Sequence, residues 1–592
     1  MPPASPDRGR QTQLKLRTKT GCFTCKKRRV KCDEAKPRCL RCTSTGRKCD
    51  GYSSPSNTRP SSTRALNLNL HLTPRPIPPL TLFTNPSTAL ERRSFQFFYE
   101  RTVPSLLGYT GSDFWNRLVL QVSQREKPVW HALIALGSLH ENFEGDRVVP
   151  GLWLRRRGWD SFALTEYLCA IRALLGGGGE GGGKRDGGEW SKSVPVDVCL
   201  ICCILFACFE VLSSHYDSAI GHIRGGIKIM KETYYDPRSG TFCHPYLKPS
   251  TVSGLEMGTL HKMLIALQDQ VLTLTRDDID MQLAHSTSFT GNPYLDIPSS
   301  FNSIAEARNI FEYYRYKAAR DLRDKVGTDH NIETTSAFTA LLQSYDPLIQ
   351  QFSTSLHQFE QTRSENLTPR EQIGLKILKI HQNMQLIRLE YGKIGVSDQV
   401  SWDKFNWLFE EIVNLAAYVV DSIHGIDCLS LSETQLEELS RQGKFKPSFT
   451  LDMGIVGPVY NTATLCRDPY IRRRAVRVLR SASRQEGCFN SHVCAVIAEH
   501  AIAIEEAAAA AIRRYSDRVH QMIPNILPSL KKFQAQAETI TYCSEVPEAA
   551  RLVYIYPRVD AVGKKVYMRL RQGGVDVDVP LTDVAVVEES VS

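Results

Sequence analysis

The stretch CFTCKKRRVKCDEAKPRCLRCTSTGRKC, residues 22–49, decides how the N-terminal part of the chain folds. Six cysteines follow the spacing C-x2-C-x6-C-x6-C-x2-C-x6-C, and the first three recur 17 residues later. Zinc takes four ligands in a tetrahedron, and thiolate sulfur is among its usual protein ligands. The pattern therefore predicts a metal-bound module whose ligands are Cys22, Cys25, Cys32, Cys39, Cys42 and Cys49.

The number of ligands sets the arrangement of the metals. Two zinc ions need about eight ligand bonds in total, whereas the stretch offers six thiolates and contains no histidine. Six sulfurs can supply all of these bonds if two of them each bind both ions. The repeat makes equivalent residues the natural bridging pair, and Cys22 and Cys39 open its two halves. We therefore expect two zinc ions bridged by these two sulfurs.

The redox setting favours metal binding over disulfides. The N-terminal residues MPPASPDRGRQ lack the apolar run of a secretory signal, so we expect a reducing compartment, in which clustered cysteines bind metal. The other eleven of the 17 cysteines are scattered, mostly in apolar runs. Because a module of this size has little apolar core, the metal is expected to supply its folding free energy.

The two halves of the stretch differ in charge. Five of the six residues between Cys25 and Cys32 are basic, against two of six between Cys42 and Cys49. If Lys26–Lys31 is helical, its middle can direct Arg28 and Arg29 at base edges, because arginine pairs bidentately with guanine in the major groove. The remaining cations are expected to bind phosphates and set the register: Lys26, Lys27, Lys31, Lys19, Arg17 and Lys36.

The charge of the whole chain is concentrated at its start. Residues 1–60 carry 16 Lys and Arg side chains against four Asp and Glu, a net charge of +12, whereas the whole chain carries +10. A basic head on a nearly neutral body predicts a polyanion-binding module attached to a regulatory body. The run Lys26–Arg29 can also serve as a nuclear import signal, so we expect the protein in the nucleus.

The stretch, with Pro37 in KPRC between its halves, resembles the fungal binuclear zinc-cluster transcription factors. The resemblance implies that Cys22 and Cys39 bridge the metals. It also implies that the basic segment reads CGG-type triplets of double-stranded DNA. Three later stretches resemble the helical regulatory domain that follows this cluster in many fungal regulators: Glu91–Tyr109 with Trp130–Glu144, His215–Met230, and Cys466–Arg480.

We expect a small irregular zinc-cluster module followed by a large, mostly all-α domain. The expected parts are a disordered basic N-terminus (1–20), the DNA-binding module (21–50), a linker rich in Ser, Pro, Thr and Asn (51–88), a helical regulatory domain (89–520) with a Gly-rich loop at 176–188, and a C-terminal extension (521–592) whose last part, 551–592, forms either short strands or a loose tail. Apolar periodicity predicts helices at 196–232, 258–284, 303–325, 334–362, 369–393, 402–424, 432–442, 468–480 and 489–517.

Other classes of protein, such as membrane proteins and enzymes, have little support in the sequence motifs. The run Val198–Phe209 is too short to span a bilayer, so it predicts a buried helix and no membrane partner. No Gly-rich phosphate loop, Gly-x-Ser-x-Gly elbow or dinucleotide fingerprint occurs, so we do not expect an enzyme. His131, His140, His215 and His222 are predicted to be packing or surface residues. Arg472–Arg474, Arg477 and Arg480 predict an acid-paired or solvated helix face rather than a second DNA site.

The leading hypothesis is a sequence-specific DNA-binding regulator of RNA polymerase II transcription that acts on the transcription machinery. The alternative is a zinc-stabilised interaction scaffold, or a co-regulator, without DNA specificity of its own. Residues 51–90 contain no sustained heptad repeat. Either the helical body forms a homodimer or the protein binds a single triplet, and the sequence leaves both open.

Overall fold

The computed structural model describes residues 22–28, 30–51, 88–109, 113–145, 161–175, 194–275, 296–326, 336–394, 398–452, 454–514, 540–560, 565–572 and 575–580. The chain divides into two compact units, residues 1–80 and 81–592, and each is described by itself. The expected N-terminal tail (1–20), the Gly-rich loop (176–188) and nearly all of the expected linker (51–88) lie outside the described residues.

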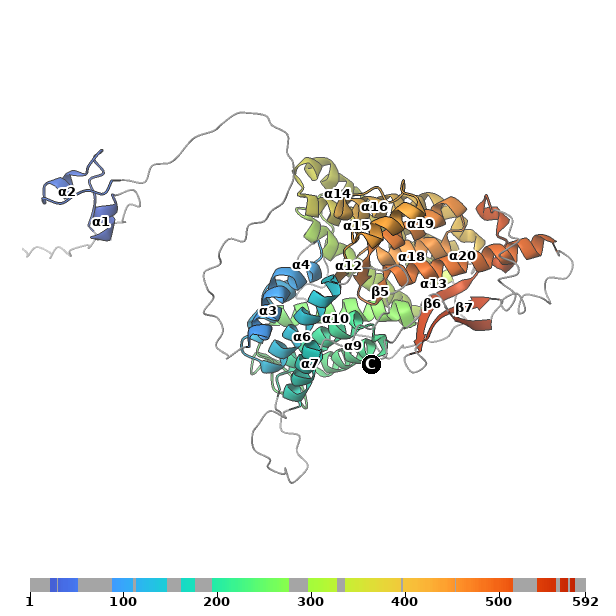
Figure 1. The fold of residues 1–592 in the computed structure, drawn as a ribbon, viewed down its shortest axis with the longest axis horizontal. Helices are drawn as coiled ribbons and strands as arrows, with labels where there is room; N and C mark the ends of the chain where they lie inside the picture. The colour runs from blue at the N-terminus through green and yellow to red at the C-terminus, as the bar shows by residue number, and fades with distance from the viewer. Residues whose placement is uncertain are drawn as a thin grey trace, which may run out of the picture. The chain divides into compact units, whose positions relative to one another are not determined.

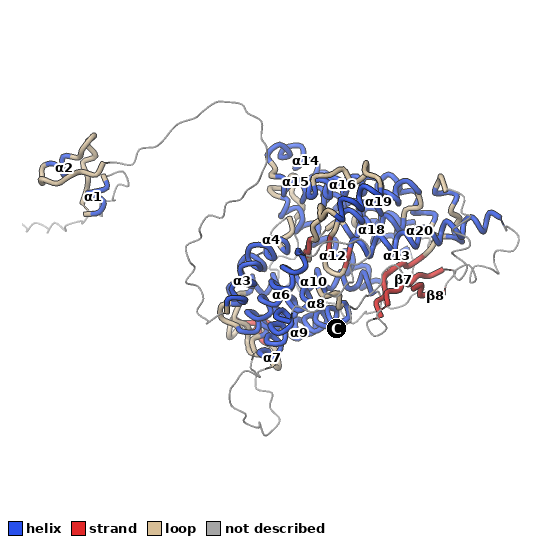
Figure 2. The backbone as a smooth tube through the Cα atoms, viewed as in Figure 1, coloured by secondary structure: helices blue, strands red, loops and turns tan. Residues whose placement is uncertain are grey.

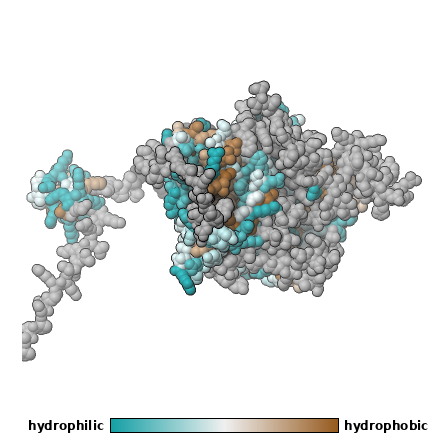
Figure 3. Space-filling model, turned by 90° about the horizontal axis from the view of Figure 1, so that it is seen from below, coloured by the Kyte–Doolittle hydropathy of each residue, from teal (hydrophilic) through white to brown (hydrophobic). Residues whose placement is uncertain are grey.

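The first unit contains two short helices, α1 (Phe23–Lys27) and α2 (Leu40–Thr43), joined by irregular chain. Among residues 22–28 and 30–51, the buried residues are the six cysteines, which form a cluster of their own. In Figure 3 the visible face of this unit, at the left, is mostly hydrophilic. The expected small irregular module is confirmed, and its centre is made of sulfur rather than aliphatic side chains.

The second unit is mostly helical (Figure 2), as expected. Its first core lies among the helices that are blue to green in Figure 1. They are α3 (Ala89–Phe97), α4 (Val103–Leu106), α5 (Val119–Ser123), α6 (Lys127–Gly145), α7 (Ser161–Leu174), α8 (Val196–Leu212), α9 (Tyr216–Glu232) and α10 (Gly254–Thr275), with π-helical turns at Phe98–Thr102 and Phe114–Leu118.

Helix α8 confirms the predicted buried helix, because nearly all of its side chains are excluded from solvent. Its acidic residues are buried with partners, as buried charges require. Asp197 accepts hydrogen bonds from the Thr251 backbone N–H and hydroxyl at 2.9 and 2.8 Å. Glu210 accepts one from the Tyr167 hydroxyl at 2.7 Å. No helix in the described ranges is long and apolar enough to cross a membrane.

The other helices enclose two further cores. They are α12 (Ile304–Val326), α13 (Ser336–Gln343), α14 (Asp346–Arg363), α15 (Pro369–Ile394), α16 (Asn406–His424), α17 (Glu433–Arg441), α18 (Val456–Leu465), α19 (Pro469–Ala482) and α20 (Ser491–Arg514). Helix α16 ends at Gly425, whose φ of 63° is a left-handed conformation that glycine adopts without strain.

Several predicted helices needed correction. The segment 196–232 is two helices, because Ser214 adopts a positive φ of 60° and turns the chain between α8 and α9. The segment 334–362 is also two helices, and Pro347 stands in the first turn of the second, α14. Residues Val400–Phe405 form a 3-10 helix before α16, and Phe489–Asn490 form a strand before α20.

The strands are short and form three small sheets. Strands β1 (Tyr234–Asp236) and β2 (Thr241–Cys243) pair antiparallel. In the second sheet β3 (Ser448–Thr450) pairs parallel with β4 (Arg484–Glu486), which pairs antiparallel with β5 (Phe489–Asn490). In the third, β6 (Val553–Asp560), β7 (Lys565–Gln572) and β8 (Val575–Pro580) form an antiparallel meander. Of the two alternatives expected near the C-terminus, short strands or a loose tail, the described residues form strands.

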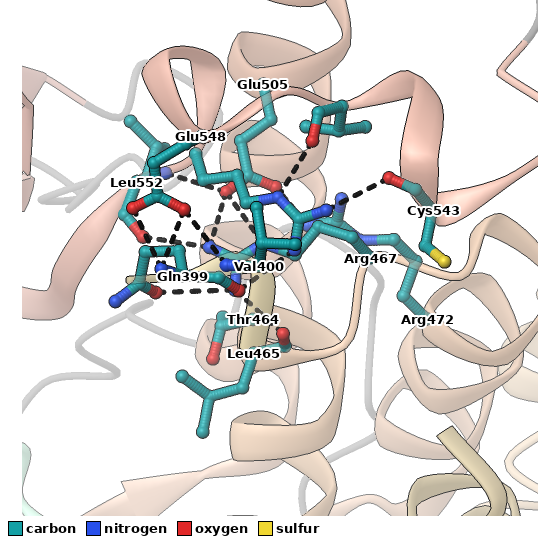
Figure 4. A network of polar contacts seen from close by, with 12 residues as sticks. Gln399, Val400, Thr464, Leu465, Arg467, Arg472, Glu505, Cys543, Glu548 and Leu552 are labelled. Carbon is teal, nitrogen blue, oxygen red and sulfur yellow. Dashed lines mark hydrogen bonds and ion pairs between the residues drawn. The ribbon is translucent and has the colours of Figure 1, made fainter. Parts of the chain in front are cut away.

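The C-terminal segment is joined to the helices by buried charge as well as by apolar packing. Leu552, Met568 and Leu570 belong to the same core as α16 and α18–α20. Figure 4 shows the polar side: Arg467 donates to the Leu552 carbonyl oxygen at 2.9 Å, and Glu505 accepts from the Leu552 N–H at 2.8 Å. The expected C-terminal extension therefore shares a core with the helical domain.

Candidate zinc and DNA-binding module

The sulfur atoms of both halves meet at the centre of the N-terminal unit. Cys22 Sγ lies 3.6 Å from Cys39 Sγ and 3.9 Å from Cys42 Sγ, and Cys25 Sγ lies 3.7 Å from each of the latter two. These four sulfurs all lie within 4.8 Å of one another. All 17 cysteines are free thiols, so no disulfide competes for them.

The 17-residue repeat of the sequence is also a repeat of contacts. Cys22 and Cys39 are the N-cap residues of α1 and α2, and their sulfurs accept the N–H of Cys25 and Cys42 at 3.4 and 3.3 Å. Likewise, the N–H of Cys22 points at Cys32 Sγ at 3.4 Å, and the N–H of Cys39 at Cys49 Sγ at 3.5 Å. Each half therefore forms the same turn, in which backbone N–H groups point at cysteine sulfurs.

The donor set fits zinc. Burial raises the pKa of Cys22 to about 12 and also raises that of Cys25, so thiolates at these positions need cations close by. Two Zn²⁺ ions among six thiolates leave a charge of −2, which the surrounding lysines and arginines offset. Backbone N–H groups that point at the sulfurs favour the thiolate form as well.

The expected reading helix is shorter than the segment Lys26–Lys31. Helix α1 ends at Lys27, Arg28 is its C-cap, and the Val30 N–H returns to the Cys25 carbonyl oxygen at 3.1 Å. A helix continued to Cys32 would carry that residue roughly 10 Å along the axis from Cys25, too far for the two sulfurs to share a metal. The helix therefore ends before Cys32, because the sulfur of that residue must reach the cluster.

The cations predicted to bind DNA are mostly on the surface. Lys26, Lys27, Lys31 and Lys36 are exposed, and Lys26 Nζ lies 5.8 Å from the centre of the Phe23 ring. Arg28 is half-buried, and its Nη1 has no hydrogen-bond partner among the described residues. Arg29, Lys19 and Arg17 lie outside the described residues.

The module has three further polar residues that the cysteine spacing and the basic run do not point to: Thr24, Asp33 and Asp50. Asp33 Oδ2 accepts the Leu40 N–H at 2.9 Å and Oδ1 accepts the Arg41 N–H at 3.0 Å. Thr24 Oγ1 lies 2.9 Å from Asp50 Oδ2. A signal was present, because an aspartate directly follows the last cysteine of each half at the same 17-residue offset.

The sulfur geometry and the charged surface correspond to a known domain. Residues 20–59 match the fungal Zn(2)-Cys(6) binuclear cluster domain. That domain binds two zinc ions, in agreement with the ligand count and with the clustering of the six cysteines. No solved structure matches the chain.

Curated relatives of the chain are named as fungal regulators of transcription. The aspercryptin biosynthesis cluster-specific transcription regulator of Emericella nidulans is 34% identical over 231 residues, 36% of this chain and 35% of that protein. The transcription regulator lscL of Purpureocillium lilacinum is 31% identical over 213 residues, 35% of this chain and 47% of that protein. The chain thus spans between a third and a half of the length of these two relatives.

The histidines set aside in the sequence analysis have structural partners. His140 is fully buried on α6, with Nδ1 2.9 Å from the Thr102 hydroxyl. His131 Nδ1 lies 2.7 Å from Glu166 Oε2, and His215 Nδ1 lies 3.0 Å from Glu210 Oε2. His222 Nε2 lies 2.9 Å from the Tyr167 hydroxyl. These contacts confirm packing and surface roles.

The second arginine cluster is an acid-paired helix face, as predicted. Along α19, Arg472 pairs with Glu505, Arg473 with Glu506, Arg474 with Glu410 and Arg480 with Glu499. Arg477 donates to the Leu429 carbonyl oxygen at 2.9 Å. Four of the five guanidinium groups are therefore neutralised by carboxylates of the body.

Proposed function

We propose that this protein is a sequence-specific DNA-binding transcription factor. It acts in the nucleus on transcription by RNA polymerase II and reads CGG-type triplets of double-stranded DNA. The observation that carries the proposal is the placement of exposed lysines on and just after α1, a helix that is fastened at Cys22 and Cys25 to the sulfur cluster. Relatives that are named as transcription regulators support it.

In this proposal all six cysteines ligate zinc. Cys22 and Cys39 are the bridging pair, since each opens one half and their sulfurs are 3.6 Å apart. Zinc supplies the folding free energy that so small a core lacks. The chain's own contribution is to hold α1 at a fixed angle, so that cations following Cys25 face the DNA.

The base-reading and phosphate-binding roles are divided among the cations. Arg28 and Arg29 contact guanine edges in the major groove. Lys26, Lys27, Lys31 and Lys36 neutralise phosphates, together with Lys19 and Arg17. The second half carries fewer cations and mainly completes the fold. Residues 89–520 regulate this activity, and we assign no catalytic role to them.

The proposal is tested by exchanging one arginine in each half of the full-length protein. Arg29→Ala is expected to lower affinity for a CGG-containing duplex by roughly 10- to 100-fold, the usual value of a bidentate base contact, with two zinc ions retained. Arg47→Ala, in the second half, is the matched control and is expected to bind normally. Fluorescence anisotropy with the duplex and a triplet-scrambled duplex measures both.

Unchanged discrimination by Arg29→Ala would contradict the assigned reading segment. A wild-type protein that bound both duplexes equally would instead favour a zinc-stabilised interaction scaffold without DNA specificity. Whether the protein binds as a homodimer through its helical body or as a monomer on a single triplet follows from the stoichiometry of the same complexes.

A further inference from the structure

The acid that follows the last cysteine of each half bonds to the helix that opens the other half. Asp33 follows Cys32, and its two carboxylate oxygens accept the first N–H groups of α2, those of Leu40 and Arg41. Asp50 follows Cys49 and contacts Thr24 in the first turn of α1. The two halves therefore hold each other through two crossed polar contacts.

The contact between Thr24 and Asp50 is the more elaborate of the two. The Thr24 hydroxyl accepts the Asp50 backbone N–H at 2.9 Å. It can donate its proton to Asp50 Oδ2 at 2.9 Å or to the Lys48 carbonyl oxygen at 3.2 Å. Beside it, the Phe23 N–H donates to the Gly51 carbonyl oxygen at 3.0 Å. The first turn of α1 is thus tied to the last residues of the module.

These hydrogen bonds matter because α1 cannot maintain its orientation by itself. It has five residues, and helices of that length are not stable in isolation. Cys22 and Cys25 fasten one side of α1 to the sulfur cluster, which leaves rotation about that attachment to be restrained by other contacts. Thr24 lies between the two cysteines and is the residue through which Asp50 restrains it.

The direction of α1 decides where the cations point. Lys26 and Lys27 lie within one helical turn of Thr24 and Arg28 caps the helix, so a change in its tilt moves all three relative to a DNA groove. We propose that Asp50, acting through Thr24, is a positioning residue for base reading by this module. The inference rests on the proposed DNA-binding function.

The test removes the hydroxyl or the carboxylate in the full-length protein. Thr24→Val and Asp50→Ala are expected to keep two zinc ions per chain but bind the preferred duplex roughly three- to tenfold more weakly, the size of one lost hydrogen bond. They are also expected to discriminate less well against a duplex with one triplet base changed. The double variant should be no weaker than the weaker single variant, because the two residues act through one contact.

Two matched variants serve as controls. Thr24→Ser keeps the hydroxyl and is expected to restore both affinity and discrimination. Thr43→Val removes a hydroxyl on α2 that, among the residues the structure describes, bonds only to the carbonyl oxygens of Cys39 and Leu40 at its own helix. It is expected to leave DNA binding unchanged. Zinc content and anisotropy are measured on the same samples.

Two outcomes would overturn the positioning role while the proposed function stands. One is wild-type affinity and discrimination in Thr24→Val. The other is a loss of binding in Thr24→Val that is fully matched by loss of zinc, because the contact would then retain metal rather than orient α1. If the wild-type protein itself showed no preference between the duplexes, the proposed function would fail, and the positioning role with it.

Discussion

Arg467 and Glu505 form a fully buried ion pair in which Arg467 Nη2 lies 2.8 Å from Glu505 Oε1. Arg472 contacts the other oxygen of Glu505 at 2.8 Å. Burial acts to raise the pKa of Glu505, but the charges of Arg467 and Arg472 hold it below its usual value. One carboxylate thus pairs with two guanidinium groups and also accepts the N–H of Leu552, where the C-terminal segment meets the helices (Figure 4).

Removal of this carboxylate is expected to destabilise the body strongly. Glu505→Gln leaves two arginines buried without a counter-charge, and breaking a buried pair in this way costs about 3–5 kcal/mol. The neighbouring Glu506→Gln is the control, because its partner Arg473 is about half exposed to solvent and exposed pairs contribute about 1 kcal/mol or less. Chemical denaturation of both variants measures the difference. Equal stability of the two would contradict the role of Glu505.

The stability of the body is expected to fall in acid. Burial lowers the pKa of His140 to about 4, with a smaller contribution from Arg101. Loss of contact with water likewise lowers the pKa values of the half-buried His381 and the buried His492 to about 3. A group whose pKa is lower in the folded state takes up its proton more readily when unfolded. The contribution of these groups to stability is therefore complete above about pH 6.5, and it is lost as pH falls through 4 to about 3.

The contribution of His140 can be isolated by substitution. Each unit of lowered pKa corresponds to about 1.4 kcal/mol, so His140→Gln, whose side chain takes up no proton, is expected to lose less stability than wild type on acidification from pH 7. Thermal melts between pH 7 and 4 measure both slopes. Parallel curves for the two proteins would show that His140 does not contribute to the acid sensitivity.

Zinc removal is expected to unfold the first unit and leave the second intact. The core of the first unit consists of the six cysteines, whereas the second has three large apolar cores of its own. A chelator should abolish DNA binding and expose the amides of residues 22–51 to hydrogen exchange. The exchange of α8 and α16 should not change. Loss of protection in those helices would mean that the body also depends on the metal.

Affinity for DNA is expected to depend steeply on salt, and unequally on the two halves. Each phosphate contact that is lost lowers the slope of log affinity against log salt by about 0.9. Lys31→Gln is expected to lower the slope by about that amount. Lys48→Gln, also exposed but in the second half, is expected to leave it unchanged. Titrations at several salt concentrations compare them, and equal effects would contradict the division of roles between the halves.

Much of the module could be predicted from its sequence, because zinc fixes ligand number and geometry. The spacing of six cysteines therefore indicated two ions and a pseudo-symmetric pair of halves. The end of α1 at Lys27 could not be predicted from the basic run, whose residues all tolerate a helix. It is imposed by the long-range requirement that Cys32 return to the sulfur cluster. The polar contacts of Asp33 and Asp50 were also missed, since pairing between halves depends on tertiary structure.

The body shows the same division between local and long-range information. Periodicity predicted most helices, including the buried α8. It did not predict the breaks between helices at Ser214 and before Pro347, which depend on the local turn of the chain. The segment that leads into the C-terminal strands is bonded to α20 where the Leu552 N–H donates to Glu505. These two residues are distant in sequence. No pattern within either segment predicts their contact.

The module at Cys22–Cys49 is proposed to read a DNA sequence. The most direct measurement is selection of binding sites from random double-stranded DNA by the full-length, zinc-loaded protein. We predict enrichment of CGG triplets, with an orientation and spacing that also reveal whether one or two modules bind, and loss of enrichment when zinc is chelated. A selected pool without any enriched triplet, from protein containing two zinc ions per chain, would contradict the account.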